Sequence, residues 1–350
     1  MQYKLLSVSK NSKLKGRVNI GDYVQALASS QYLPQIDGFV DRDENLKEYH
    51  DGPTAVIMNG WYMHNPLNWP PSDDIIPLFV AFHLNVLAKK EMTSPESIAY
   101  LKRHEPIGCR DIDTMNLLKS HGVEAYFSAC MTLTLGKKFH DDNKDENTYI
   151  VDPPFSFDFT LANFIRGLCH GMHYWTDIKK IWKYKLLFPQ RKNFIKRFIK
   201  LSLFHQEYSR VFGREIIANS IYINQEGSHY GISLPDDSTR LKEAERLIRG
   251  YAKAKMVITS RIHCALPCLG LGTPVIYIEK QQDIEASTCR LNGIRDFFNI
   301  VKLDKNHLKP DFEAVLPLNP DNCPRNKDNY KKYADALDKK CTEFVSASLK

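Results

Sequence analysis

The sequence predicts an α/β protein of two domains, with helices packed on parallel sheets. The chain has 350 residues, which is enough for two domains with a core each and too many for one compact core. Short runs rich in β-branched and aromatic residues alternate with helical stretches in both halves, and this alternation is typical of parallel sheets. The apolar fraction of 43% and the charged fraction of 25% are those of an ordinary folded protein.

The first half of the chain alternates between strand and helix, and its helix boundaries are well marked. Ser94 and Pro95 occupy N-cap and first-turn positions of one helix. Asp111 or Asp113 can cap another helix, which ends at Gly122. The expected strands cover residues 3–9, 54–60, 76–84, 106–111 and 123–129, and the expected helices cover residues 21–33, 94–105 and 112–122.

A polar and charged stretch at residues 136–148 marks the expected domain boundary. We therefore expect an N-terminal Rossmann-like domain over 1–145 and a C-terminal one over 146–325, followed by a helix in 326–350 that can pack back on the N-terminal domain. The second half shows strands at 148–154, 255–260 and 273–279, an apolar run at 214–224, and helices at 236–254 and from near Ile262.

The composition also bears on compartment. Residues 1–13 return to Lys and Ser before a secretory apolar region could form, so we expect no signal peptide. No run of about eighteen apolar residues occurs, and we expect no membrane span. Eight cysteines without a secretory signal suit reduced thiols in the cytoplasm, and Cys264 and Cys268 are best interpreted as buried thiols. The net charge of +7 suits anionic partners in general.

The segment 177–205 is dense in Lys, Arg, Trp, Tyr and Phe. Basic and aromatic residues at helical spacing are what a helix on an anionic membrane surface requires, so residues 179–200 are a candidate for peripheral attachment to the inner membrane face. The alternative is a solvated helical hairpin whose aromatic stripe faces the core. Nucleic acid is not expected, because no recognised reader motif accompanies the patch.

The strongest candidate for chemistry follows the apolar strand that ends at Ser260. Arg261 stands at the start of the next helix, where free N–H groups and an arginine suit a phosphate or carboxylate. His263 would titrate near neutrality and could transfer a proton. The alternative is that Arg261 pairs with a core acid and that His263 caps the helix.

Three further places could contribute to a site at the same rim. Arg110 follows a short strand, although Asp111 beside it permits a plain surface ion pair. Gly21 would let the backbone approach a ligand, and Asp22 could bind a sugar hydroxyl or cap the helix. A single glycine is a weak signal, because the segment is neither a GxGxxG nor a Walker loop.

Aromatic residues after the strand 54–60 could bind a sugar. Trp61 is expected in a loop with Tyr62, His64 and Trp69, where a ring can stack on the apolar face of a sugar. His83 would lie in the same crevice. The alternative is that the tryptophans close the rim of the first domain.

No metal site is expected. The sequences DRD at 41–43 and DID at 111–113 have the Asp-x-Asp pattern, but we expect both in solvated or capping positions.

An ordered set of segments resembles the polysaccharide pyruvyl transferase family. The set runs from about residue 19 to about residue 300, and it consists of NIGDYVQALAS, VIMNGW, FVAFH, IGCRD and ITSRIHCALPCLGLGTPVIYI. The region from roughly 155 to 215 shows no motif of the family. After the strand 273–279 the sequence reads KQQDIEAS, which does not align with the family, so donor contacts beyond Glu279 are not assigned.

The resemblance implies a fold like that of the two-lobed GT-B glycosyltransferases, with the active site in the cleft between the domains. The donor would be phosphoenolpyruvate, a co-substrate that needs no cofactor. The acceptor would be a sugar of a cell-surface glycan, such as a capsule or exopolysaccharide, or of its lipid-linked precursor. Two hydroxyls of one sugar would end on the same pyruvate carbon as a ketal, with release of phosphate.

The resemblance also implies roles for single residues. Arg261 and His263 match the family's Arg-x-His element, which implies donor binding by Arg261, with Ser260 beside it, and proton transfer by His263. Arg110 would be a second clamp on the donor anion. Gly21 and Asp22 match the early Gly-Asp turn of the family and are assigned to the acceptor or the cleft. Trp61 and His83, which we expect in one crevice after the strand 54–60, are also assigned to the acceptor.

Two other functions stay open from the sequence. One is a nucleotide-sugar glycosyltransferase of the same fold, which would need a pocket for a base and ribose in the second domain, where no acidic ribose-binding pair is evident. The other is a non-catalytic component of a glycan assembly complex, held on a membrane by the basic segment. In that case loss of His263 would be harmless.

Overall fold

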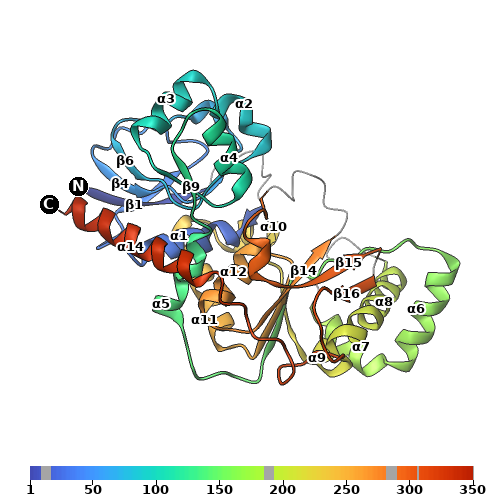
Figure 1. Cartoon of the computed structure of the whole chain (residues 1–350). Coiled ribbons are helices and arrows are strands. Elements are labelled where there is room, and N and C mark those ends of the chain that lie inside the picture. The colour runs from blue at the N-terminus through green and yellow to red at the C-terminus, as the bar shows by residue number, and fades with distance from the viewer. Residues whose placement is uncertain (9–16, 185–192, 281–289, 306, 350) are drawn as a thin grey trace.

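The structure, a computed structural model, describes residues 1–8, 17–184, 193–280, 290–305 and 307–349. Figure 1 shows the N-terminal strands above and the C-terminal sheet below, with α1 (Ile20–Ser30) and α12 (Ile262–Gly270) between them. The expected α/β class with parallel sheets is confirmed. No helix among the described residues is long and apolar enough to cross a membrane.

Two four-stranded sheets make up the N-terminal part, and all their neighbouring strands are parallel. The first has the order β3-β1-β4-β6 and the second the order β5-β7-β8-β9. The strands are β1 (Gln2–Ser7), β3 (Gly38–Asp41), β4 (Thr54–Ile57), β5 (Gly60–Tyr62), β6 (Ile75–Leu78), β7 (Phe82–Leu84), β8 (Ile107–Cys109) and β9 (Ala125–Phe127).

Two neighbouring segments of the chain pass from the first sheet to the second: β4 is followed by β5, and β6 is followed by β7. The N–H of Met58 donates to the carbonyl of Leu78 at 2.8 Å, and the N–H of Gly60 donates to that of Ala81 at 3.2 Å. Residues 76–84 therefore form two strands instead of the single strand that we expected. The chain turns between them at Ala81, whose φ is 52°.

The C-terminal sheet has six strands in the order β11-β10-β13-β14-β15-β16, and only the last pair is antiparallel. A short antiparallel pair, β2 with β12, joins the N-terminal part of the chain to the C-terminal part. The strands are β2 (Val18–Asn19), β10 (Thr148–Val151), β11 (Ile221–Ile223), β12 (Glu226–Gly227), β13 (Met256–Thr259), β14 (Val275–Lys280), β15 (Asn299–Asp304) and β16 (His307–Pro310).

The expected helices are present, and their caps explain where they begin. The Ser94 side chain accepts from the N–H of Ser97, with Pro95 in the first turn, and Asp111 caps the next helix at Thr114. The remaining helices are α2 (Lys89–Met92), α3 (Pro95–Arg103), α4 (Ile112–Ser120), α5 (Gly136–Phe139), α6 (Leu161–His173), α7 (Trp175–Trp182), α8 (Phe194–Phe212), α9 (Arg214–Asn219), α10 (Ser228–Ser233), α11 (Asp237–Lys253) and α14 (Lys331–Ser348), with short 3₁₀ turns η2 (Pro66–Asn68), η3 (Val86–Ala88), η4 (Met131–Leu135) and η6 (Arg295–Phe297).

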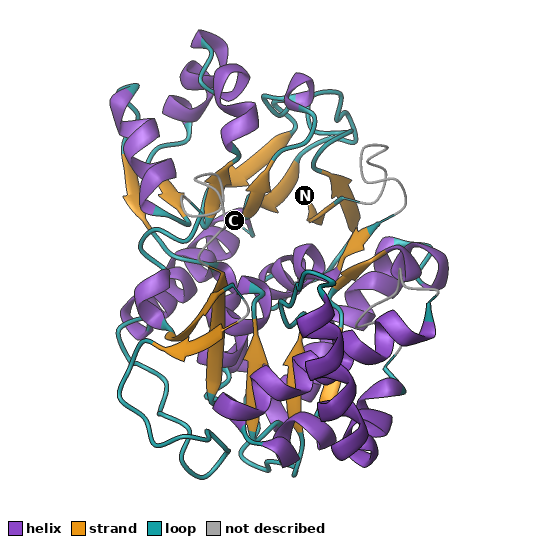
Figure 2. Cartoon of the chain, turned by 90° about the vertical axis from the view of Figure 1, so that its right-hand side faces the viewer, coloured by secondary structure: helices purple, strands orange, loops and turns teal. Residues whose placement is uncertain are grey.

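The segment expected to hold an interfacial helix forms a helical layer beside the C-terminal sheet (Figure 2). Side chains of α7 and α8, including Ile181, Phe198 and Phe204, are buried in one cluster with sheet residues such as Ile258. Phe198 and Phe204 therefore face the core, as in the alternative interpretation of the sequence, whereas Phe194 at the start of α8 is exposed. Residues 185–192 of the basic run lie outside the described part of the chain.

The largest hydrophobic cluster is shared by both halves of the chain. It joins Leu5 and Val24 of the N-terminal part to Leu247 and Val257 of the C-terminal part. Each half also has a cluster of its own, as expected, and the shared cluster is additional to these two. The shared cluster forms because α1 buries nearly all of its surface, and much of it packs on α11 rather than on its own sheet.

The C-terminal helix α14 returns to the N-terminal part. The Tyr32 hydroxyl donates to Asp338 at 3.0 Å, and Lys137 pairs with the same carboxylate at 2.7 Å. Cys341 is buried against Met131. These contacts extend the shared cluster along α14.

Two glycines allow α12 to approach η4 closely. A Cβ on Gly270 would overlap the carbonyl oxygen of Leu133, and a Cβ on Gly136 would overlap the carbonyl of Gly270. Because both obstacles are backbone atoms, a side chain at either position cannot be accommodated by a rotamer change. This contact sets the distance between the N-terminal sheets and α12, which carries His263.

We predict that Gly270→Ala destabilises the protein by about 3 kcal/mol, because the added methyl group must push α12 away from η4. Urea unfolding measures the change. The matched control is Gly250→Ala in α11, where the new Cβ would meet only the Tyr149 hydroxyl at 3.1 Å. Equal stability of the two variants would contradict the close approach.

Candidate functional site

A cavity of about 220 Å³ lies between residues of the N-terminal and C-terminal parts. It brings together six of the eight residues selected from the sequence, since Asp22, Trp61, Arg110, Ser260, Arg261 and His263 all line it. Gly21 does not line the cavity but packs against His263, which does. His83 does not line it either. The other lining residues are Asn19, Arg42, His64, Gln225, Glu226, Ile262 and Arg290.

The carboxyl ends of parallel strands supply the key side chains. Arg110 follows β8 directly, Arg42 follows β3, and Ser260 follows β13. In open α/β sheets ligands bind at this edge, because loops and helix N-termini converge there. The placement that we inferred for Arg110 and Ser260 is therefore the placement in the structure.

Arg110 is buried, with 1% of its surface exposed, and its guanidinium group lacks described hydrogen-bond acceptors that would offset its charge. Its Nε and Nη1 atoms have no hydrogen-bond partner within the described part of the chain. Burial lowers the pKa of the guanidinium below its usual value, which reflects the cost of holding a charge there. The surface ion pair with Asp111 considered from the sequence is wrong, because both residues are buried and Asp111 binds His83 instead.

Arg290 and His263 have unpaired nitrogens at the same cavity. Nε of Arg290 and Nε2 of His263 are buried and, among the described residues, have no hydrogen-bond partner. Arg290 was not selected from the sequence, because the residues that follow Glu279 do not align with the family.

His263 is held as a neutral imidazole. Burial lowers its pKa well below the usual value, and the cations of Arg110 and Arg290 lower it further. The expectation that His263 titrates near neutrality therefore disagrees with its buried position. The helix-capping alternative also fails, because α12 has no side-chain cap and His263 lies inside it with non-helical angles, φ −83° and ψ 16°.

Gly21 positions the imidazole of His263. A Cβ at Gly21 would lie 3.1 Å from Nδ1 and 3.2 Å from Cβ of His263. The residue is thus required for close packing of the two halves at the site, and its N–H donates to Asn19 at 3.0 Å. The cap of α1 is consequently Asn19 and not Asp22, the capping residue that we had considered.

Arg261 is matched by two carboxylates. Its Nε donates to Asp152 at 2.8 Å, and its Nη1 lies 3.0 Å from Glu226. Burial opposes the charge, but these two acids raise the pKa of Arg261. The alternative in which Arg261 pairs with a core acid is thus observed, although the side chain keeps 36% of its surface exposed and still lines the cavity.

Asp152 links several parts of this edge. It accepts from the N–H of Gln225 at 3.0 Å, and its carbonyl accepts from the Ser260 hydroxyl at 2.7 Å. Gln225 in turn accepts at its carbonyl from the N–H of Ile20 at 2.9 Å and donates through its side chain to the carbonyl of His263 at 3.1 Å. The network fixes α1 and α12 to the end of β10.

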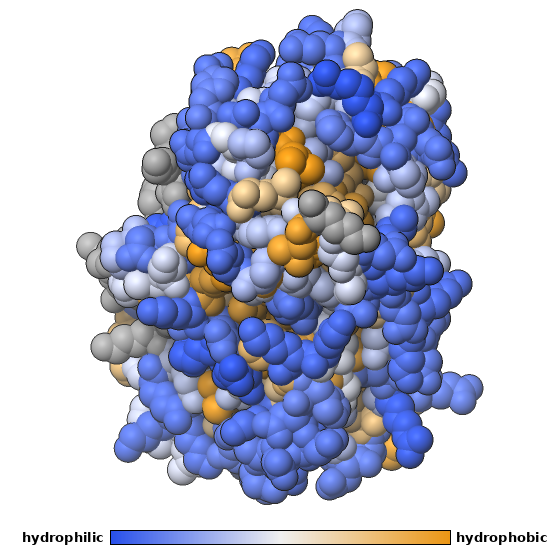
Figure 3. All heavy atoms as spheres, turned by 90° about the vertical axis from the view of Figure 1, so that its left-hand side faces the viewer, coloured by the Kyte–Doolittle hydropathy of each residue, from blue (hydrophilic) through white to orange (hydrophobic). Residues whose placement is uncertain are grey.

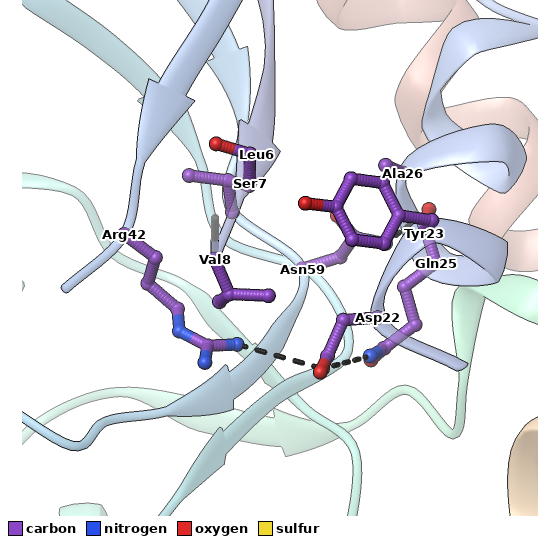
Figure 4. A pocket seen from close by; sticks show the side chains of 9 residues that line it. All are labelled: Leu6, Ser7, Val8, Asp22, Tyr23, Gln25, Ala26, Arg42 and Asn59. Carbon is purple, nitrogen blue, oxygen red and sulfur yellow. Dashed lines mark hydrogen bonds and ion pairs between the residues drawn. The ribbon is translucent and has the colours of Figure 1, made fainter. Parts of the chain in front are cut away.

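Arg42 is a residue of the site that sequence reasoning did not select. Figure 4 shows it pointing toward Asp22 across a pocket of about 10 Å³, too small for more than one water. Its Nη1 lies 3.8 Å from Asp22 and its Nη2 lies 3.2 Å from Asp43. Burial raises the pKa of Asp22, an effect that Arg42 opposes.

The three residues of the DRD sequence at 41–43 are buried, whereas we expected a solvated or capping position. Asp41 accepts from the N–H groups of Asp43 and Glu44, and Asp43 accepts from that of His64 at 2.6 Å. The two aspartates therefore order the turn that carries Arg42, and no helix begins there. Sequence alone could not show that the arginine between them enters the cavity.

The aromatic residues at 61–69 have divided roles. Tyr62 and Trp69 are buried in the N-terminal core, so of the two tryptophans only Trp61 is left to line the cavity. Trp61 lies on strand β5 and not in a loop, and it lines the cavity with His64, whose ring is 4.4 Å away. The Arg42 guanidinium lies 5.5 Å from the Trp61 ring.

His83 lies behind the cavity and does not line it. Its Nδ1 is 2.5 Å from Asp111, whose other oxygen caps α4. Burial lowers the pKa of His83 to about 4, with Arg110 as the next cause. The residue supports the environment of Arg110, and the structure does not bring it to the surface of the acceptor crevice that we expected.

A second cavity of about 370 Å³ adjoins the first. It shares Ser260, Arg261 and Arg290 with the first cavity and continues over the ends of β10 and β14, at Pro153 and Lys280. Neither cavity contains a group of three or more His, Cys, Asp or Glu that could hold a metal, as far as the described residues go.

We predict that His83 stays neutral in the folded protein down to a pH near its pKa of about 4. An unfolded histidine binds its proton near pH 6.5, so this burial makes folding less favourable as the pH falls from 6.5 toward 4. Imidazole NMR titration checks this, with His140, an exposed residue whose pKa is raised by Asp142, as the internal control. A His83 pKa at or above 6.5 would contradict the lowering of its pKa by burial and by the charge of Arg110.

The comparison with protein families agrees with this geometry. The model of the family described as polysaccharide pyruvyl transferase matches residues 19–280, about three quarters of the chain. This range holds every cavity residue selected from the sequence and ends at the strand β14. No curated protein and no solved structure matched the chain. The chain belongs to the polysaccharide pyruvyl transferase family.

Proposed function

We propose that this protein transfers pyruvate from phosphoenolpyruvate to two hydroxyls of one sugar, forming a ketal and releasing phosphate. The observation that carries the proposal is the buried guanidinium of Arg110, with two nitrogens unpaired among the described residues. A buried cation without partners is costly, and an anionic ligand removes that cost. Membership of the polysaccharide pyruvyl transferase family supports a pyruvyl donor as this anion.

The donor carries a phosphate and a carboxylate, and the cavity offers two arginines for them. Arg110 and Arg290 both line it and both have buried nitrogens without a described partner. Arginine binds such groups through charge-assisted, often bidentate, hydrogen bonds. We assign the two anionic groups to these arginines, and Arg261 and Ser260 to the wall of the donor site.

The reaction needs an acid that acts after the donor has bound. Phosphate and carboxylate would offset the positive charge of Arg110 and Arg290, two of the causes that lower the pKa of His263. The imidazole could then take up a proton and deliver it to the methylene carbon of the donor. Its unpaired Nε2 at the cavity is the atom we assign to this transfer.

Two carbon–oxygen bonds then form at one carbon. A sugar hydroxyl adds to the carbon that bears phosphate as the methylene becomes a methyl group, and the hydroxyl gives up its proton. A second hydroxyl of the same sugar displaces phosphate, so that the bond between this carbon and the phosphate oxygen breaks, and the proton of this hydroxyl leaves with the phosphate. Asp22 borders the cavity, and burial raises its pKa, which suits a carboxyl that accepts a proton from a hydroxyl.

We place the acceptor against Trp61 and Asp22, which line the cavity together with Arg42. Trp61 offers an aromatic ring on which a sugar can stack. We propose a sugar of a cell-surface glycan or of its lipid-linked precursor. The site would lie in a GT-B-like cleft between domains 1–145 and 146–325, in a protein that works in the cytoplasm.

We predict that the purified protein releases phosphate from phosphoenolpyruvate only when a sugar acceptor with two suitably spaced hydroxyls is present. The sugar product should carry an acid-labile pyruvate ketal, which mass spectrometry detects as added pyruvate. Consumption of a nucleotide sugar, with no phosphate release over a broad acceptor panel, would favour a glycosyltransferase instead. Full activity of His263→Ala would remove the proposed acid and contradict the mechanism.

We predict that Arg110→Gln weakens donor binding on the order of a hundredfold, since a lost buried charge pair costs about 3 kcal/mol. Arg261→Gln should affect donor binding less and thermal stability more, because it leaves Asp152 and Glu226 without their cation. Binding of phosphoenolpyruvate measured by calorimetry separates the two effects. The control is Arg246→Gln, an exposed residue of α11 that pairs with Glu243; unchanged donor affinity in Arg110→Gln would exclude Arg110 from the site.

A further inference from the structure

The helix α6 presents a stripe of apolar side chains to solvent. Leu161, Ile165, Leu168 and Met172 recur at helical spacing, and their exposed fractions range from 36% to 75%. Residues spaced by four, three and four positions lie on one face of a helix. Trp175, which begins α7, is 49% exposed and adds an aromatic ring next to the stripe.

The opposite face of α6 is already used. Gly167 and Gly171 are buried against α8, where added Cβ atoms would meet side chains of Ile199 and Phe198. This close approach fixes which face of α6 turns inward, so the apolar stripe cannot be buried by a rotation of the helix. The exposed stripe is thus a property of the folded protein.

Exposed apolar residues are concentrated in this region. Of the seventeen large hydrophobic residues that are exposed in the described part of the chain, eight lie between Phe159 and Ile195. The face on the far side of the molecule, which carries α14, is hydrophilic over most of its area, with small separate hydrophobic areas (Figure 3). Large apolar clusters on a protein surface mark interaction sites.

The same region carries the positive charge of the protein. Residues 155–215 contain twelve Lys and Arg and four Asp and Glu, a net charge of +8, whereas the whole chain has +7. Two of these cations border the stripe: Arg166 lies on α6, and Lys196 of α8 places its ammonium group 5.5 Å from the ring of Phe159. The rest of the chain is close to neutral.

No residue of α6 lines either cavity. Figure 1 shows α6 at the outer edge of the C-terminal part, with α7, α8 and α9 between it and the sheet, and Figure 2 shows these helices in front of the strands. The surface is separate from the proposed active site.

We propose that the exposed face of α6, with Trp175 and the start of α8, docks on the surface of a bilayer that contains anionic lipid. An apolar stripe of this width can enter the boundary between headgroups and acyl chains, and the flanking cations meet anionic headgroups. This places the membrane contact on α6 and not chiefly on residues 179–200, where the sequence had suggested it. The inference does not depend on the proposed reaction.

The test is flotation of the full-length protein with two kinds of vesicle. One contains phosphatidylglycerol and phosphatidylcholine in equal parts, and the other contains phosphatidylcholine alone. We expect binding to the first at low salt, weaker binding at high salt because the charges are screened, and little binding to the second. Binding to neither vesicle at low salt would overturn the proposal.

Variants assign the binding to α6. Ile165→Ser with Leu168→Ser should weaken binding on the order of tenfold or more, since each removes an apolar side chain from the headgroup boundary. Lys196→Glu should weaken it at least about fivefold. The matched controls are Leu87→Ser, at a residue that is 88% exposed on η3, and Lys339→Glu on α14; both should bind as the unaltered protein does.

A protein partner is the competing occupant of this surface. Sedimentation of the unaltered protein and of Ile165→Ser with Leu168→Ser distinguishes the two cases, and circular dichroism confirms that the variant is folded. A monomer in both supports the membrane surface. A dimer that the variant dissociates, or vesicle binding that the variant leaves unchanged, would overturn it.

Discussion

The packing of α12 on η4 is the contact on which the rest of the structure depends. Gly270 lets the end of α12 touch the backbone of Leu133, and a hydrophobic cluster common to both halves surrounds this junction. At the other end of the same helix His263 lies against Gly21. The two close approaches hold the carboxyl ends of the N-terminal and C-terminal strands at one cavity, and side chains from distant parts of the sequence share a site as a result.

The charges of that site fall into two kinds. Arg261 is matched by Asp152 and Glu226, and its partners bind it to the end of the C-terminal sheet. Arg110 and Arg290 keep buried nitrogens without partners among the described residues. Burial, with these two cations as the next causes, lowers the pKa of the His263 imidazole well below its usual value. Under the proposed function, a bound anion would offset the charge of the cations. Binding of the donor and protonation of the acid are therefore expected to be linked.

The site could be predicted from the sequence wherever a residue directly follows a strand. Arg110 and Ser260 were found in this way, because the carboxyl ends of parallel strands meet at one edge. Arg42 also follows a strand. It was not selected, because the aspartates on either side of it led us to expect a solvated or capping position for the whole DRD sequence. His83 was placed in the crevice from its strand position, yet its contact with Asp111 turns it inward. Spacing along a chain does not reveal such side-chain partners.

The sequence by itself determined the alternation of strand and helix, the helix caps at Ser94 and Asp111, and the charge and apolar content of the region 155–215. These properties depend on local propensity and hydrogen bonding within a few residues, and no distant contact is needed to establish them. The tertiary structure decided which cations are paired, the protonation of His263, and which apolar residues of that region face solvent. The pairing, the protonation and the exposure of a side chain depend on its burial and on the charges around it. The residues that bury or surround it come from strands and helices far away in the sequence.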